Sequence, residues 1–358
     1  NTIGLGKKKD YQNRSVVTTP TEIVKYMVDK TLSKVCEGKT PSEILNVSVA
    51  DIACGSGIFL EEAFAYLQDY CVQWYISNGQ TDHLIETGID LYKLPLQEKK
   101  DILCSCIYGI DIDIHAVEVA KFSLLIKLIE GETAPSVAEV VPILPDLGDN
   151  IQFGNSLVSQ TELNGISGAN HQMMEIAPFD WNAINNGCGF DVIIGNPPYV
   201  NTEGMHTLLP SAEVEVYKKK YKTSHKQFDK YFIFIEQAIN KIKENGLVCY
   251  IVPNKFFKIG AGEKLRSLIA KERMLVSLDD FGDAQLFEDK TIYSSIILLS
   301  KEKQTTFVYS SVDSANKLWA GEEVSSIELS SSVLNKLPWR LTTDFEFLTM
   351  LQRLDEVS

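Results

Sequence analysis

The chain has 358 residues, of which 44% are hydrophobic and 23% are charged. This composition is typical of a globular protein, and it excludes a disordered chain, a collagen-like chain and a small disulfide scaffold. The 34 basic and 48 acidic residues give a formal net charge of −14, which on its own argues against a surface built to hold nucleic acid.

Targeting and redox signals in the sequence are weak. No run approaches the roughly 20 apolar residues that cross a bilayer, and no basic segment followed by an apolar one stands at the start. The seven cysteines are scattered without a C-x-x-C pair, which favours reduced thiols over zinc or disulfides. We therefore expect a cytoplasmic protein with no metal site and no membrane contact. Because the chain begins with Asn1 and ends in a charged helical pattern, we also expect it to be a piece of a longer protein.

The first half of the chain alternates between helical and strand-like hydrophobic patterns. Residues 1–15 are polar and basic, and we expect them to form a loose lead-in. Three stretches rich in glycine, proline or polar residues are expected to be irregular, namely 76–104, 131–149 and 159–189. The pattern predicts, in order, a helix after Thr18-Thr19-Pro20, a strand at 47–53, a helix at 58–75, a strand at 108–113, a helix at 115–130 and a strand at 151–155.

The second half continues this alternation. Residues 190–195 (FDVIIG) have the pattern of a buried strand and run directly into Asn196-Pro197-Pro198-Tyr199, after which we expect a polar loop. Further elements are predicted at 228–243 (helix), 247–252 (strand), 261–272 (helix), 275–281 (strand) and 292–299 (strand). Alternating strands and helices indicate an α/β fold with a parallel sheet covered on both faces. The sequence becomes Ser/Thr-rich over 301–340, and we place a domain boundary near residue 300.

Four of the predicted strands end in unusual residues. In an open α/β sheet, ligands bind beyond the carboxyl ends of the strands. Because the four ends share that position, we expect one binding site to be built from them. The residues concerned are Asp51 through Gly57, Asp111, Asn155, and Asn196 through Tyr199.

The first of these strand ends is a glycine turn that leads into a helix. Gly55 and Gly57 would let the backbone approach a bound nucleoside and point amide groups at it. Leu60 stands where the dinucleotide fingerprint G-x-G-x-x-G has its third glycine, so a dinucleotide fits poorly. A tight strand-to-helix turn without a ligand is the alternative interpretation.

Asp111 ends the second of these strands. An acid at this position can accept hydrogen bonds from the hydroxyls of a ribose. Asp113 competes for the role, and either residue could instead cap the following helix. The separation of Asp111 from Asp51 is much longer than the roughly 20 residues of a dinucleotide unit, so the interpretation requires an insertion, which residues 76–104 supply.

Asn196-Pro197-Pro198-Tyr199 is the most informative stretch. Two prolines fix the backbone after a buried strand and remove two amide donors. The Asn196 side-chain oxygen and the Pro197 carbonyl could accept both hydrogens of a planar amino group, and Tyr199 offers a flat face for stacking. A rigid turn in which the asparagine is satisfied by the protein itself is the alternative.

Together these residues resemble the motifs of the amino-group DNA methyltransferases that modify N6 of adenine with S-adenosylmethionine. The match runs over residues 16–300 in the γ-type motif order. It implies a Rossmann-like S-adenosylmethionine-dependent methyltransferase fold of the α/β class, with a seven-stranded mixed sheet, helices on both faces, and insertions. It also implies that residues 301–358 form a linker and the start of a target-recognition region.

The resemblance implies a role for each matching residue. Asn155 stands where many family members have Asp, although its amide oxygen remains an acceptor. The catalytic motif corresponds to Asn196, Pro197, Pro198 and Tyr199. The implied cofactor-binding residues are Thr18, Thr19, Pro20, Asp51, Ala53, Cys54, Gly55, Gly57, Phe59, Asp111, Ile112, Asn155, Ser156 and Leu157. The implied contacts to the base or to DNA are Phe287, Lys255, Phe256, Lys218, Lys219 and Lys220.

The insertion after the first helix that follows the glycine turn and the long loop after Tyr199 are similar to those of type IIG restriction–modification enzymes. In that group a nuclease precedes the methyltransferase core and a target-recognition domain follows it. The implied partner is double-stranded DNA with a flipped adenine, and both partner domains would lie outside this chain. The stretch from Tyr217 to Lys230 contains six lysines and one acid and falls in the expected loop. These lysines could contact DNA phosphates, or the stretch could be a solvated loop without a ligand.

Three other functions stay open at this point. RNA adenine presents the same base, and the Asn-Pro-Pro-Tyr pattern also occurs in methyltransferases that act on a glutamine of release factors. The motif at residues 18–20, the basic stretch and Phe287 argue against the glutamine enzyme. An inactive module that binds cofactor and DNA within a defence complex is the third possibility, and the intact Asn196 and Tyr199 argue against it.

Overall fold

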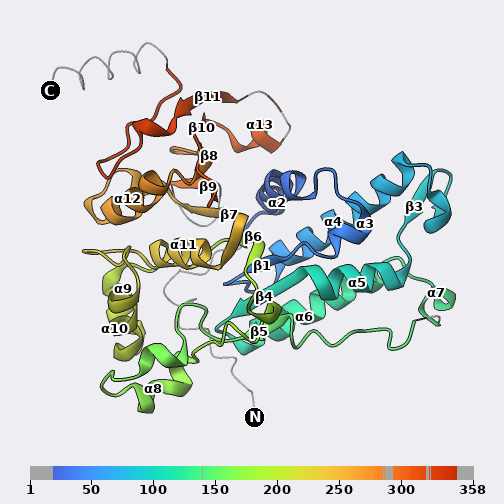
Figure 1. Cartoon of the computed structure of the whole chain (residues 1–358), viewed down its shortest axis with the longest axis horizontal. Helices are drawn as coiled ribbons and strands as arrows, with labels where there is room; N and C mark the ends of the chain where they lie inside the picture. The colour runs from blue at the N-terminus through green and yellow to red at the C-terminus, as the bar shows by residue number, and fades with distance from the viewer. Residues whose placement is uncertain are drawn as a thin grey trace. The chain divides into compact units, whose positions relative to one another are not determined.

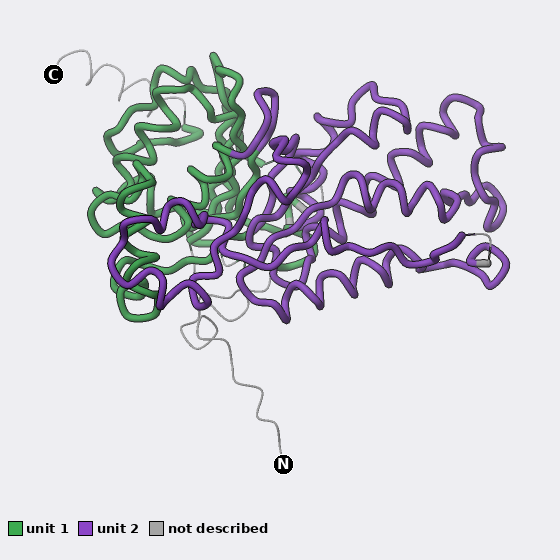
Figure 2. The backbone as a smooth tube through the Cα atoms, turned by 60° about the horizontal axis from the view of Figure 1, so that its bottom comes forward, with its two compact units in different colours: residues 1–23, 196–240, 248–358 green, residues 24–195, 241–247 purple. Residues whose placement is uncertain are grey.

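The computed structural model describes residues 19–138, 140–284, 286, 293–319, 322 and 324–344 (Figure 1). Backbone contacts divide the chain into two compact units (Figure 2). Unit 1 comprises residues 1–23, 196–240 and 248–358, and unit 2 comprises residues 24–195 and 241–247. Each unit therefore combines segments that are distant in the sequence, and each is described by itself.

Unit 2 contains four parallel strands in the order β6-β1-β4-β5. They are β1 (Val49–Asp51), β4 (Ile107–Asp111), β5 (Ile151–Phe153) and β6 (Phe190–Gly195). Their buried residues are mostly Val and Ile, as expected for strands that are covered on both faces. Because the strands are parallel, their carboxyl ends lie at one edge of the sheet, where the sequence predicted the site.

Three helices of unit 2 pack against these strands. Helix α4 (Ile58–Ser77) contacts β1 and β4, α6 (Ile114–Ile129) contacts β4 and β5, and α5 (Leu96–Cys106) contacts β4 and both other helices. The unit also contains most of α2 (Thr21–Cys36), α3 (Pro41–Ile44), the hairpin of β2 (Ile85–Gly88) and β3 (Leu91–Lys93), α7 (Ala134–Ala138), α8 (Ala169–Ile176) and the 3-10 turns η1 (Thr81–His83), η2 (Gln160–Leu163) and η3 (Asn185–Gly187).

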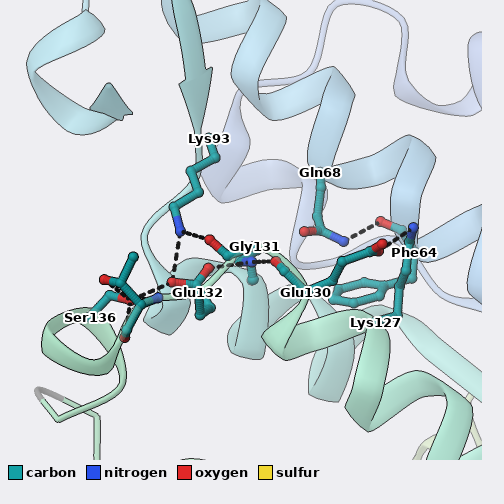
Figure 3. A network of polar contacts seen from close by, with 10 residues as sticks. Phe64, Gln68, Lys93, Lys127, Glu130, Gly131, Glu132 and Ser136 are labelled. Carbon is teal, nitrogen blue, oxygen red and sulfur yellow. Dashed lines mark hydrogen bonds and ion pairs between the residues drawn. The ribbon is translucent and has the colours of Figure 1, made fainter. Parts of the chain in front are cut away.

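A buried polar network fastens the insertion between β1 and β4 to the end of α6 (Figure 3). Glu132 follows α6, and its carboxylate lies 2.9 Å from Nζ of Lys93 in β3 and 2.5 Å from Nζ of Lys99 in α5. Ser136, in α7, donates its hydroxyl to the same carboxylate at 2.7 Å. The Glu132 side chain is only 1% exposed, so these partners are what make its burial tolerable.

Unit 1 contains a mixed set of strands in the order β11-β10-β8-β9-β7, and β7 belongs to this unit from residue 248 onward. Strand β8 is antiparallel to β9 and parallel to β10, and β10 is antiparallel to β11. The helices and strands of this part are α9 (Thr202–Leu208), α10 (Ser211–Lys220), α11 (Lys230–Lys241), β7 (Ile242–Pro253), η4 (Asn254–Phe257), η5 (Gly260–Gly262), α12 (Glu263–Glu272), β8 (Leu275–Asp280), β9 (Ser294–Ser300), β10 (Thr306–Ser311), α13 (Ala315–Trp319), β11 (Ser325–Ser330) and η6 (Ser331–Val333).

The α/β class and the mixed strand directions agree with prediction, but several details differ. Among the described residues, the strand orders of the two units contain nine strands in total, whereas a seven-stranded sheet was predicted. The two additional strands are β10 and β11, which lie in the Ser/Thr-rich stretch after residue 300. The prediction of irregular structure at 76–104 is wrong over α5 and the hairpin, and the loop predicted after Tyr199 is wrong over α9 and α10. None of the described helices is both long and apolar enough to cross a membrane.

Candidate functional site

The glycine turn after β1 adopts a backbone that requires glycine. Gly55 has φ +56° and Gly57 has φ +91°, both in the left-handed region. A Cβ added at Gly57 would lie 3.0 Å from the Cβ of Ala120 in α6, whereas one added at Gly55 would meet no atom within 4 Å. Gly57 therefore allows close packing of the turn on α6, while the space beside Gly55 is open. The buried Phe59 begins the core face of α4.

Asp111 connects the end of β4 to the glycine turn. Its Oδ2 accepts a hydrogen bond from the Gly55 amide at 2.8 Å, and its Oδ1 accepts one from the Asp113 amide at 2.8 Å. Asp113 in turn caps α6, because its carboxylate accepts a hydrogen bond from the His115 amide at 3.0 Å. The structure thus separates two roles that the sequence left open: Asp113 is the cap, and Asp111 holds the turn. Ile112 lies between them and is partly exposed.

Asp51 ends β1 in a buried position. It is 3% exposed, and its carboxylate accepts a hydrogen bond from the Ala53 amide at 3.0 Å. Burial raises the pKa of Asp51 to about 7, although the hydrogen bond from Ala53 opposes the rise. A Cβ added at Gly195, the last residue of β6, would lie 2.7 Å from Asp51 Oδ1. Gly195 was not singled out from the sequence, and its only signal there is its place directly before Asn196.

The segment after β5 is tied to the segment after β1. Ser156 donates its hydroxyl to the Ile52 carbonyl at 2.7 Å. Asn155 is 4% exposed, and its side-chain oxygen accepts a hydrogen bond from the Leu157 amide at 3.1 Å. Cys54 is also anchored, since its amide donates to the Ile110 carbonyl at 3.0 Å. The cofactor-binding residues predicted on β1, β4 and β5 thus come together at one edge of unit 2.

Residues 196–199 form the NPPY corner, which lies in unit 1. Asn196 donates Nδ2 to the Thr19 hydroxyl at 3.0 Å, and its Oδ1 accepts a hydrogen bond from the Tyr199 hydroxyl. The Tyr199 hydroxyl also lies 2.9 Å from the Ile251 carbonyl, to which it donates. The hydroxyl of Thr19, a predicted cofactor-binding residue, therefore lies on the Asn196 amide. Within the described part of the chain, no hydrogen-bond donor reaches the Pro197 carbonyl.

The Tyr199 ring is held by a second tyrosine. Its ring meets that of Tyr231 edge-to-face, with the centroids 6.0 Å apart and an interplanar angle of 80°. Tyr231 is fully buried and donates its hydroxyl to the Pro253 carbonyl at 3.1 Å. Burial raises the pKa of Tyr199 above its ordinary value, so its hydroxyl is a neutral donor at physiological pH.

The residues predicted to contact the base or DNA have different surroundings. Phe256, a predicted base contact, is fully buried against Phe232, Phe257 and Trp339. Lys255 is about half exposed, and its Nζ lies 2.9 Å from Asp229 Oδ2. Thr18 and Phe287 lie outside the described residues.

The three predicted phosphate-binding lysines end helix α10 instead of lying in a loop. Lys219 pairs with Glu215 at 2.6 Å, and Lys218 Nζ lies 3.3 Å from His206 Nε2. Lys220 lies over the Tyr221 ring, 4.8 Å from its centroid. Positive charge in the last turn is favourable for a helix, which gives these lysines a structural reason to be there.

Residues 105–287 match the family model of the Eco57I restriction-modification methylase. The matched segment covers just over half of the chain. The chain belongs to this family. It is 43% identical over 95% of its length to the type II restriction enzyme and methyltransferase RM.Eco57I of Escherichia coli, of which it spans 33%. It is 25% identical over 81% of its length to the type II methyltransferase M.BstVI of Geobacillus stearothermophilus, of which it spans 42%.

Two solved structures of DNA complexes share the fold. A nuclease-deletion mutant of the type ISP enzyme LlaGI, in complex with a DNA substrate mimic, matches with a TM-score of 0.60 and 15% identity over 95% of this chain and 28% of that one. The DrdV–DNA complex matches with a TM-score of 0.56 and 16% identity over 86% of this chain and 29% of that one. The predicted kinship with methyltransferases of restriction–modification systems is confirmed. This Eco57I-type chain spans 33% of RM.Eco57I and 42% of M.BstVI.

Proposed function

We propose that this Eco57I-type chain transfers a methyl group from S-adenosylmethionine to N6 of adenine in double-stranded DNA, as the modification part of a restriction–modification enzyme. The observation that carries the proposal is the way the NPPY corner is built. Thr19 and Tyr199 fix both ends of the Asn196 amide, and the neighbouring Pro197 carbonyl receives no donor from the described residues.

An exocyclic amine is the group that such a corner suits. The lone pair of the adenine amino group is delocalised into the ring, so the group is a poor nucleophile until its geometry changes. Asn196 Oδ1 accepts from Tyr199 through one lone pair and has a second for a substrate hydrogen. The Pro197 carbonyl supplies the other acceptor. Acceptors that are already fixed lower the barrier through positioning and through oriented dipoles.

The strand ends of unit 2 fit the cofactor. When bound, S-adenosylmethionine supplies a methyl group on a positively charged sulfur, which needs no further activation. The open space at Gly55 leaves the backbone of the turn accessible to a nucleoside. Asp111 is held by two backbone amides and would accept hydrogen bonds from ribose hydroxyls, and Asn155 would contact the adenine of the cofactor.

The DNA side of the proposal involves both described and undescribed residues. A base that is modified at its amino group must rotate out of the duplex, at a cost of a few kcal/mol. Tyr199 would offer its ring to the flipped base, with Phe287 as the second aromatic side chain. Lys218, Lys219 and Lys220 would contact phosphates, in competition with the ion pair of Lys219. A nuclease and a target-recognition domain would flank this chain, with the recognition region beginning in residues 301–358.

The test is methyl transfer from tritiated S-adenosylmethionine to DNA, RNA and a release factor, followed by digestion and identification of the labelled product. Labelled N6-methyladenine in DNA is the expected result. Label in RNA or on glutamine would assign the substrate to another class, and cofactor binding without transfer would indicate an inactive module. Asn196→Ala should bind the cofactor normally and transfer no methyl group, which separates loss of chemistry from loss of folding.

A further inference from the structure

Two segments of unit 1 hold the NPPY corner, namely the start of α11 and the end of β7. Tyr199 donates its hydroxyl to the Ile251 carbonyl of β7 at 2.9 Å, and its ring contacts Tyr231 in the first turn of α11. Directly after the corner, the Val200 carbonyl accepts a hydrogen bond from the Lys230 amide at 2.8 Å. The position of the Tyr199 hydroxyl therefore depends on how these two segments are held together.

Two contacts join the segments to each other. The Tyr231 hydroxyl donates to the Pro253 carbonyl at 3.1 Å, and Lys255 Nζ lies 2.9 Å from Asp229 Oδ2. Asp229 is 4% exposed, whereas 47% of the Lys255 side chain is exposed. A buried carboxylate is costly without a partner, so the lysine is what allows Asp229 to keep its charge in this place. Burial raises the pKa of Asp229, and the ammonium of Lys255 opposes that rise.

Asp229 also contacts the chain that leaves the corner. It forms an antiparallel bridge with Asn201, two residues after Tyr199. The Asn201 side chain accepts a hydrogen bond from the Gly204 amide at 2.8 Å and so begins helix α9. The ion pair thus lies where the outgoing chain, α11 and the end of β7 converge, all within unit 1.

We infer that the Asp229–Lys255 ion pair is a positioning device for the NPPY corner. It fixes the end of β7 against the start of α11, and it thereby holds the Ile251 carbonyl where the Tyr199 hydroxyl needs it. The inference rests on the proposed function, since it assigns these residues an indirect part in the same reaction. Asp229 and Lys255 act through Tyr199 and have no direct role at the amino group.

A direct contact of Lys255 with a DNA phosphate is the competing role. An ammonium at 2.9 Å from a buried carboxylate is already neutralised locally, so a phosphate gains less from it than from an unpaired lysine. The two roles change different quantities. A positioning pair acts on the rate of the bound complex, whereas a phosphate contact acts on KM for DNA and on its salt dependence.

The experiment compares Asp229→Asn, Lys255→Gln, the double variant and Lys255→Arg with the unmodified protein. We expect each neutral substitution to lower kcat about 10- to 100-fold with KM for DNA almost unchanged, because misplacement of a fixed group acts on the chemical step. The double variant should be no slower than the slower single variant, and Lys255→Arg should recover most of the rate. Lys317→Gln is the matched control, because it breaks an exposed ion pair with Asp313 in the same unit and should leave kcat unchanged.

Hydrogen exchange provides a readout that does not depend on activity. In Asp229→Asn and Lys255→Gln, the Lys230 amide and the amides of 201–206 should exchange faster than in the unmodified protein, and Lys317→Gln should leave them unchanged. Failure of the unmodified protein to methylate adenine would refute the proposed function, while the exchange rates would still decide the role of the pair. Unchanged exchange, or a change confined to KM and the salt slope, would overturn the inference.

Discussion

Replacement of Tyr199 by phenylalanine tests the NPPY corner with the smallest possible change. The substitution keeps the ring and removes the hydroxyl that donates to Asn196 Oδ1 and to the Ile251 carbonyl. Ile251 is fully buried, so its carbonyl is left without this donor, at a cost of about 1–3 kcal/mol. Without the Tyr199 hydroxyl the Asn196 amide is less well fixed, and it should stabilise the transition state by about 1.4–2.8 kcal/mol less. This loss corresponds to a reaction about 10- to 100-fold slower.

Single-turnover methyl transfer at saturating DNA and cofactor is the appropriate assay, because it isolates the chemical step. Tyr199→Ala also removes the ring, so it should cost about 1–3 kcal/mol more through lost stacking on the base. Tyr70→Phe is a matched control, since the Tyr70 hydroxyl likewise donates to backbone carbonyls, those of Cys36 and Lys39 in unit 2. It should lower stability and leave the rate unchanged. A wild-type rate in Tyr199→Phe would refute the reasoning.

Three further predictions concern unit 2 and use chemical unfolding as the measurement. Gly195→Ala places a Cβ 2.7 Å from Asp51 Oδ1 and should destabilise the protein by about 1–3 kcal/mol, and an unchanged midpoint would contradict the packing. The pKa of Asp51 is about 7 in the folded protein and lower in the unfolded chain. The folded state therefore gains up to about 4 kcal/mol of stability from protonated Asp51, and this contribution is complete below about pH 4. It is lost as the pH rises through 7. Asp51→Asn should remove that decline, and parallel pH curves for the two proteins would show that Asp51 does not titrate there. Glu132→Gln leaves Lys99 buried without a counter-charge and should cost about 3–5 kcal/mol, whereas a loss below about 1 kcal/mol would show that the network in Figure 3 contributes little.

The parts of the fold that the sequence predicted well are those with a strong local pattern. Strand β6 has the predicted bounds, because FDVIIG is a short apolar run that ends at a glycine and two prolines. Helix α4 follows a glycine turn and carries a continuous apolar face, so its prediction at 58–75 needed no distant partner. In both cases the residues that define the element lie within the element itself.

Elements stabilised by distant partners were missed. Helix α5 carries charged residues between its apolar positions, and Lys99 is buried only because Glu132 neutralises it after the chain has passed through β4 and α6. Helix α10 looks like a polar loop, yet its Glu213 is 1% exposed because Tyr217 and Lys230 surround the carboxylate. Polar residues that become buried through tertiary pairing carry no local signal of burial.

The same distinction applies to the candidate site. The types of residue at the strand ends were predictable, because glycine turns and terminal acids have local reasons to stand there. Their partners were not predictable. The Thr19 hydroxyl accepts a hydrogen bond from Asn196, although the two residues are 177 positions apart in the sequence. The Asp229–Lys255 pair has the same character, since neither residue shows from the sequence that the other lies 2.9 Å away.

These contacts have a chemical consequence for how the NPPY corner works. Asn196 and Thr19 do not ionise, and burial raises the pKa of Tyr199 above its ordinary value, so no group of the corner changes its charge near neutral pH. Its contribution to a reaction must then come from fixed acceptors and a fixed ring, and not from proton transfer by a titrating side chain. Any dependence of kcat on pH near neutrality would have to arise elsewhere, and the buried carboxylate of Asp51, whose pKa burial raises to about 7, is a group that can produce it.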